Sequence, residues 1–179
     1  MLITNLLRII TQTLESQHIP YMLSGSLALT LYAIPRATRD IDIIVELQDK
    51  HVNEFTEAIR GQFYFHEPTI KEEIKRHGMF NIIHLESSYK VDFIIRSNEP
   101  FEILKFRRRQ QIDYSGLKIW VITLEDLLIS KLIWIQQIES ELQKRDIVSL
   151  LENPDADLTY VKKWCKELHL KTYNLINYE

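Results

Sequence analysis

The feature that most constrains the fold is an acidic pair, Asp40 and Asp42, at the start of an otherwise apolar run. Side chains two residues apart on a strand point to the same face. Both carboxylates therefore project together, while Ile41 and Ile43 point to the other side, into a core. The apolar residues that follow predict a strand over residues 40–47 that is buried on both faces beyond its acidic end. The chain must build a sheet that presents two neighbouring carboxylates.

A glycine-serine turn and a third acid complete the pattern. Gly25 and Ser26 follow a short strand expected at residues 21–23, and glycine lets the backbone approach a phosphate closely. Asp92 lies among apolar residues of a later strand, where a carboxylate is costly unless a partner or a metal compensates it. Adjacent carboxylates repel unless a cation lies between them, and Mg²⁺ binds one or two carboxylates together with water and phosphate. The three acids therefore predict a two-metal site for displacement at phosphorus.

The rest of the pattern predicts an α/β (α+β) chain with a mixed, twisted sheet of about five strands. A sheet-containing core, residues 1–122, is expected to carry a small helical region, residues 123–179, packed on it. Strands are expected at residues 21–23, 40–47, 63–65, 80–85, 89–95 and 117–122, the last at a sheet edge. Helices are expected at residues 3–16, 27–33, 49–60 and 70–77, then as a pair from residue 123 and once more from residue 157.

Composition excludes several classes of protein. The single cysteine, Cys165, excludes an internal disulfide and a zinc site built on thiolates alone, and this fits a reducing cytoplasm. No apolar run reaches the ~18 residues of a membrane span, so we expect a cytoplasmic protein with no membrane partner. The 179 residues carry a formal net charge of −3, so contact with a nucleic acid would need a local basic patch.

The densest basic run is Lys105-Phe106-Arg107-Arg108-Arg109. It could contact nucleic-acid phosphates, with Phe106 stacking on a base. The alternative is a solvated surface, which is the usual role of a charge run. Arg36 and Arg39, in the loop before the acidic strand, raise the same question. A guanidinium matches phosphate geometry, so each could hold a triphosphate, or the loop could be solvated with Arg39 paired to an acid.

These residues resemble the nucleotidyltransferase superfamily that shares its fold with DNA polymerase β. The matching positions, in chain order, are Leu23, Gly25, Ser26, Asp40, Ile41, Asp42, Ile43 and Asp92. The longer run from residue 23 to 29 and from 36 to 43 looks like the branch that contains abortive-infection (AbiE-type) toxins. The resemblance covers residues 1–150, and it implies a nucleotidyltransferase that uses ATP or another NTP.

The resemblance also implies roles for individual residues. Asp40 and Asp42 would bind two Mg²⁺ ions, with Mn²⁺ as an alternative, and Asp92 would bind the catalytic ion and help deprotonate the attacking hydroxyl. Gly25 and Ser26 would hold the β- and γ-phosphates.

In the toxin branch a helix lysine reaches the nucleotide phosphates, and here Lys131 matches it. A second helix carries a basic residue followed by Asp, here Arg145-Asp146 after an unusually short loop. Asp146 would hold Lys131. The alternative is a surface helix pair in which Lys131 extends its ammonium to solvent.

The sequence leaves the acceptor open. The toxin branch implies an RNA end, such as the 3′ end of tRNA, and a neutralising antitoxin partner. A small-molecule acceptor, as in antibiotic nucleotidyltransferases, is the first alternative, and low overall basicity keeps it open. A protein acceptor is another. From a different class, the chain could be a non-catalytic module that binds a nucleotide or a partner.

Overall fold

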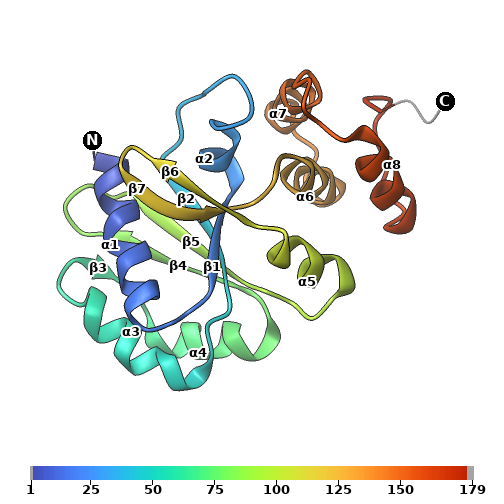
Figure 1. Cartoon of the computed structure of the whole chain (residues 1–179). Coiled ribbons are helices and arrows are strands. Elements are labelled where there is room, and N and C mark those ends of the chain that lie inside the picture. Colours follow the sequence, from blue (N-terminus) through green and yellow to red (C-terminus); the bar gives the residue numbers. More distant parts are fainter. Residues whose placement is uncertain (1, 177–179) are drawn as a thin grey trace.

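A computed structural model describes residues 2–176, and within them one mixed sheet of seven strands forms the centre of the molecule (Figure 1). Its spatial order is β3-β4-β5-β2-β1-β7-β6. The strands are β1 (Tyr21–Ser24), β2 (Asp40–Val45), β3 (Phe63–Tyr64), β4 (Met79–His84), β5 (Lys90–Ile95), β6 (Gln110–Tyr114) and β7 (Leu117–Val121). β1 and β2 lie in the middle of the sheet, so the apolar runs that form them are covered on both faces.

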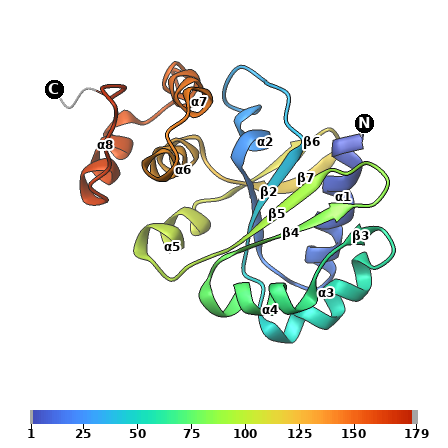
Figure 2. The ribbon, with the colours of Figure 1, turned by 180° about the vertical axis from the view of Figure 1, so that it is seen from behind.

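The helices form two groups (Figures 1 and 2). One group lies toward the N-terminal side: α1 (Leu2–Ser16), the 3₁₀ turn η1 (Asp49–His51), α3 (Val52–Ile59) and α4 (Glu67–Arg76). The other gathers on the opposite side: α2 (Gly25–Leu29), α5 (Pro100–Arg107), α6 (Leu124–Gln137), α7 (Glu141–Leu151) and α8 (Leu158–Glu167). α6 contacts α2, α7 and α8, which joins the C-terminal helices to the turn after β1. Across residues 2–176, every helix is too short or too polar to cross a membrane.

The α/β (α+β) class is confirmed, but the prediction of about five strands was wrong. The sequence Gln110–Tyr114 forms β6, which lies at the sheet edge and makes β7 an internal strand. Its apolar alternation is limited to Ile112 and Tyr114, which are only half-buried, so the strand signal is short and weak. Helix α5 was also missed, because its apolar residues do not follow one helical face. The predicted helix at residues 27–33 is shorter, since α2 ends at Leu29 and turns follow.

The pairing of β2 with its two neighbours decides the geometry of the site. β2 runs parallel to β5, with Asp40 opposite Lys90 and Asp42 opposite Asp92. β1 runs antiparallel to β2, with Ser24 opposite Asp42. Because partners in register share a face of the sheet, these side chains project together.

Candidate active site

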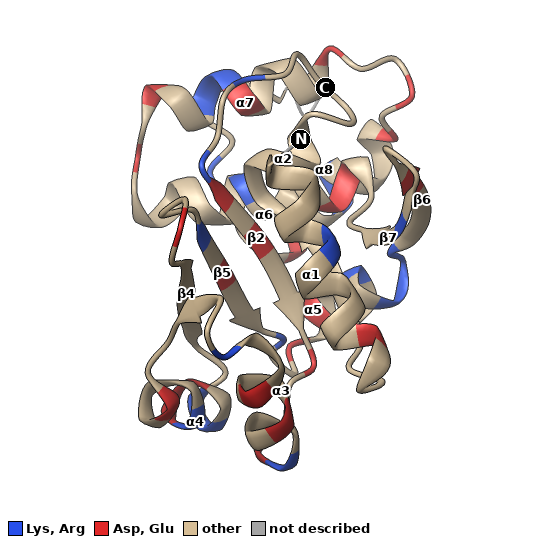
Figure 3. Cartoon of the chain, turned by 90° about the vertical axis from the view of Figure 1, so that its left-hand side faces the viewer, with Lys and Arg blue, Asp and Glu red and all other residues tan. Residues whose placement is uncertain are grey.

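The three predicted carboxylates come together on one face of the sheet. Asp42 and Asp92 are direct neighbours on parallel strands, and Asp40 lies two residues before Asp42 on the same face. In Figure 3, red bands mark the acidic residues on β2 and β5, which lie side by side. The side chain of Asp40 is 50% exposed, whereas that of Asp92 is only 8% exposed. The cluster therefore has one open end and one buried end.

The buried end of the cluster is electrostatically incomplete. Burial, and then the charge of Asp92, raise the pKa of Asp42 above its ordinary value, although a hydrogen bond from the Ser26 backbone N–H opposes them. The Oδ1 atom of Asp92 is buried and has no hydrogen-bond partner among the residues described. A buried carboxylate oxygen without a donor is costly, so this end of the cluster favours a cation.

A divalent ion fits this donor set. Mg²⁺ and Mn²⁺ prefer carboxylate oxygens, and Asp40, Asp42 and Asp92 supply them from two adjacent strands. Within residues 2–176, however, no three acidic, histidine or cysteine side chains are already drawn together around a point where an ion would lie. The nearest cation to these carboxylates is the ammonium of Lys90, with its Nζ 2.8 Å from Oδ2 of Asp92 and 3.8 Å from Oδ1 of Asp40.

The turn after β1 lies directly against Asp42. Gly25 has a φ of +62°, and a Cβ atom built there would lie 1.9 Å from Oδ2 of Asp42, so no other residue fits without moving the carboxylate. The Ser26 backbone N–H lies close enough to Asp42 to lower the pKa of that carboxyl. The Ser26 hydroxyl accepts a hydrogen bond from Nη2 of Arg36 at 2.6 Å. Both residues lie where the sequence placed them, and their role toward phosphate stays a prediction.

A second charged cluster lies beside this turn and joins three elements. The carboxylate of Asp146 on α7 accepts two hydrogen bonds from the Arg36 guanidinium, each at 2.9 Å, and one from Nζ of Lys131 on α6 at 2.7 Å. Burial raises the pKa of Asp146, but the hydrogen bonds from Arg36 and Lys131 outweigh burial and hold that pKa below its ordinary value. Lys131 also donates to Oε1 of Gln143. Asp146 therefore holds Arg36 and Lys131 at fixed positions next to Ser26.

The acids and Lys131 line one cleft of about 610 Å³. Its polar and glycine lining residues are Ser24, Gly25, Ser26, Asp40, Asp42, His77, Lys90, Asp92, Ser97, Glu102, Lys105, Ser130, Lys131 and Gln143. Its apolar lining residues are Ile44, Met79, Ile94, Ile95, Leu127, Ile133 and Trp134. Arg36 and Asp146 lie behind Lys131 rather than in the lining. Arg39 is exposed and outside the cleft lining.

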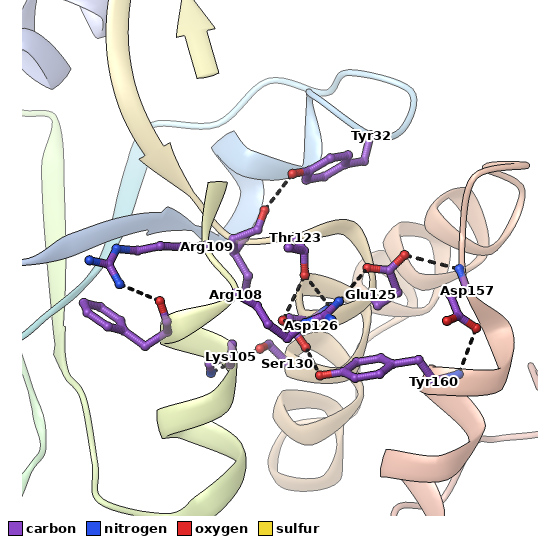
Figure 4. Close-up of polar contacts among 12 residues, drawn as sticks. Tyr32, Lys105, Arg108, Arg109, Thr123, Glu125, Asp126, Ser130, Asp157 and Tyr160 are labelled. Carbon is purple, nitrogen blue, oxygen red and sulfur yellow. Dashed lines mark hydrogen bonds and ion pairs between the residues drawn. The ribbon is translucent and has the colours of Figure 1, made fainter. Parts of the chain in front are cut away.

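The basic run is mostly engaged within the protein (Figure 4). Lys105 is buried and donates to Glu102, while Arg108 bonds to Asp126. The guanidinium of Arg109 lies 4.3 Å from the ring centre of Phe106 and donates to its backbone carbonyl. Phe106 itself is buried and cannot stack on a base. Of the five residues Lys105–Arg109, only Lys105 lines the cleft, and Arg107 is exposed.

Sequence reasoning missed Lys90, which completes the charged face of the sheet. The signal was available, because Lys90 precedes Asp92 by two residues on one strand and so shares its face. A hydrogen bond with Asp92, and then the charges of Asp92, Asp40 and Asp42, raise the pKa of Lys90 against the opposing effect of burial. Glu102 and Trp134 were also missed, and nothing in their local sequence marked them.

Comparison with solved structures shows the fold. The lincosamide antibiotic adenylyltransferase LnuA, in its lincomycin-bound form, is 16% identical, with a TM-score of 0.54 over 82% of this chain and 94% of that chain. An antigenic nucleotidyltransferase-like protein from Paracoccidioides brasiliensis is 17% identical, with a TM-score of 0.50 over 87% of this chain and 84% of that chain. No curated protein matches the sequence.

A family model described as "Nucleotidyltransferase of unknown function" matches residues 2–177, nearly the whole chain. The predicted superfamily is confirmed by this match and by the shared fold, whereas the AbiE-type branch is not. The family match agrees with the order of the turn and the three acids in the sequence, and with the sheet that brings them together. The chain therefore belongs to the DUF6036 family and is an enzyme of the nucleotidyltransferase type.

Proposed function

We propose that this enzyme transfers a nucleoside monophosphate from an NTP to an acceptor hydroxyl with the help of Mg²⁺, for which Mn²⁺ can substitute. The observation that carries the proposal is the adjacency of Asp40, Asp42 and Asp92 on one face of the sheet, with one buried carboxylate oxygen that has no partner within residues 2–176. Divalent ions bound by these carboxylates would stabilise the charge that develops on the phosphoryl oxygens.

The chain's own residues position the reactants. The acceptor oxygen forms a bond to the α-phosphorus, the bond from that phosphorus to the β-phosphate oxygen breaks, and pyrophosphate leaves with the bonding electron pair. Asp92 takes the hydroxyl proton. Ser26 and Lys131 hold the β- and γ-phosphates, and Asp146 and Arg36 fix Lys131 in place. Catalysis then depends on orientation and on charge stabilisation.

The apolar part of the cleft favours a compact acceptor. Ile94, Ile133 and Trp134 line it, and Trp134 is 45% exposed, so an apolar ring or chain can pack there. Glu102 and Lys105 supply a polar pair within reach of the same space. The structurally similar LnuA is an antibiotic adenylyltransferase, which agrees with a small acceptor in a cleft of this fold.

An RNA 3′ end is the second candidate acceptor. One observation favours it: Arg107 is exposed at the end of α5. A tRNA acceptor would carry with it the toxin role and the antitoxin partner expected from the sequence. The internal engagement of Arg108 and Arg109 weighs against a polyanionic acceptor, because these two cations are committed to protein partners.

The test is an incubation of the protein with each α-labelled NTP and Mg²⁺, in parallel with total RNA and with a panel of small hydroxylated compounds. Label on one acceptor class, absent with Asp42→Asn but present with the matched surface variant Asp155→Asn, would support transfer and identify the acceptor. Asp155 is exposed and distant from the carboxylate cluster in the sequence, so it controls for the Asp-to-Asn change itself. Labelling that is equal in wild type and Asp42→Asn would contradict the proposed site.

A further inference from the structure

Lys90 completes a two-by-two array of charged side chains. Asp40 lies opposite Lys90 and Asp42 opposite Asp92 on the parallel strands β2 and β5. All four side chains lie on one face, three of them anionic and one cationic. In Figure 3 a blue band on β5 lies beside the red bands of the same two strands.

The ammonium of Lys90 lies near two of the carboxylates in this array. It lies 2.8 Å from Oδ2 of Asp92 and 3.8 Å from Oδ1 of Asp40, so it bridges the two strands. The side chain of Lys90 is 38% exposed, whereas that of Asp92 is 8% exposed. The lysine therefore approaches a buried carboxylate from the open end of the cluster, and its long stem gives it a route back to solvent.

This contact and a metal ion compete for the same carboxylate. An ammonium and a divalent ion at one carboxylate would repel each other at close range in a partly buried site. The ammonium of Lys90 is bonded to Oδ2 of Asp92. A metal ion would need the same oxygen for a chelating or bridging contact. Without the ammonium, the three neighbouring carboxylates would repel one another more strongly, so the metal-free enzyme gains from the contact.

We propose that Lys90 is a built-in counter-cation that occupies the carboxylate cluster of the nucleotide-free enzyme and must be displaced when a divalent ion binds. This inference rests on the proposed function, since it concerns the same metal-binding carboxylates. Because Lys90 must first be displaced, the enzyme binds a divalent ion weakly when no nucleotide is present. The NTP then favours binding in two ways: its phosphates add ligands to the ion, and their charge attracts the displaced ammonium.

The test measures Mn²⁺ affinity by calorimetry without any nucleotide. Lys90→Met keeps the length of the side chain and removes its charge, so we expect its dissociation constant for Mn²⁺ to fall about 10-fold below that of wild type. Lys90→Arg keeps the charge, and its affinity should stay near that of wild type. Lys118→Met, which removes an exposed lysine on β7, is the matched control and should change nothing.

A second readout separates this role from a structural one. In chelator, Lys90→Met should melt at a lower temperature than wild type because Asp92 loses its partner, and Mn²⁺ should raise its melting temperature more than that of wild type. An unchanged or weaker Mn²⁺ affinity in Lys90→Met would overturn the proposed role of Lys90 as a counter-cation. The metal site itself would still stand in that case if Asp42→Asn abolishes Mn²⁺ binding. If wild type and Lys90→Met both fail to bind Mn²⁺ even with NTP present, the proposed function itself fails.

Discussion

Two acidic sites in this protein differ in how completely their carboxylates are satisfied. Asp126 on α6 is fully buried, and both of its oxygens have partners (Figure 4). Its Oδ2 accepts from Arg108 at 3.0 Å and from Thr123 at 2.9 Å, and its Oδ1 accepts from Tyr160 at 2.8 Å. Asp92 is almost as buried, but its Oδ1 has no partner within the described part of the chain. Its Oδ2 pairs with Lys90, a long and flexible side chain.

This difference suggests a structural role for Asp126 and a ligand-binding role for the cluster of Asp42 and Asp92. The partners of Asp126 come from the loop after α5, from the start of α6 and from α8, so one carboxylate fastens three segments together. A buried carboxylate whose two oxygens are both hydrogen-bonded is already stabilised without a ligand. The cluster of Asp42 and Asp92 keeps unused acceptor capacity within the described residues and places like charges side by side, an arrangement that would stabilise a bound cation rather than the fold.

The largest expected effect tests the unsatisfied site. Asp42→Asn should lower kcat/KM by about 1000-fold or more, because it removes a carboxylate that would hold the ions stabilising the transition state. In chelator the same variant should be at least as stable as wild type, since it removes a charge beside Asp92. Pyrophosphate release and thermal melting measure the two quantities. A variant that keeps its activity, or that fails to fold, would erase the distinction between the two acidic sites.

Asp126→Asn tests the satisfied site with the opposite pattern. Neutralising the buried acceptor of Arg108, Thr123 and Tyr160 should cost about 1.5–3 kcal/mol of the free energy of unfolding, since Arg108 keeps Glu125 as a partner. Urea denaturation measures the loss, and Asp155→Asn serves again as the surface control. The activity per folded molecule should stay close to wild type, because Asp126 lies outside the cleft lining. A large loss of activity in folded protein would make Asp126 part of the site.

Asp146→Asn should give an intermediate result, because Asp146 is buried and paired yet lies behind the cleft. Its loss weakens the bonds to Arg36 and Lys131, and about 1–3 kcal/mol of stability should go with them. Lys131 would lose its fixed position, so kcat/KM should fall by roughly 10- to 100-fold. Denaturation and steady-state kinetics check both effects. An effect on stability alone would make the cluster purely structural.

The smallest effect is a difference in pH dependence. The folded state raises the pKa of Asp42, so the stability it contributes is present below the ordinary Asp pKa of about 3.9 and is lost as pH rises through the higher folded value. The stability of Asp42→Asn relative to wild type should therefore increase as pH rises from about 4. Asp146 has a lowered pKa, so the stability it contributes is lost as pH falls. Urea titrations in chelator at several pH values test this, and a constant difference between Asp42→Asn and wild type would contradict it.

Local patterns predicted the acids, because strand alternation alone places Asp40 and Asp42 on one face. The same rule would have found Lys90, two residues before Asp92, had it been applied to cations. The ion pair of Arg36 with Asp146 joins residues 110 positions apart, so only the folded chain shows it. The basic run looked available for phosphates, yet Glu102 and Asp126 engage two of its cations. The edge strand β6 carried only a short apolar signal, Ile112 and Tyr114, among polar residues.

The most direct test of this account counts the Mn²⁺ ions bound per chain with a non-hydrolysable NTP analogue at saturation, by electron paramagnetic resonance. We expect about two ions in wild type and in Asp126→Asn, and fewer in Asp42→Asn. That result would identify the cluster of Asp42 and Asp92 as the metal site and Asp126 as a residue that only stabilises the fold. No bound ion in wild type, or equal numbers in wild type and Asp42→Asn, would contradict it.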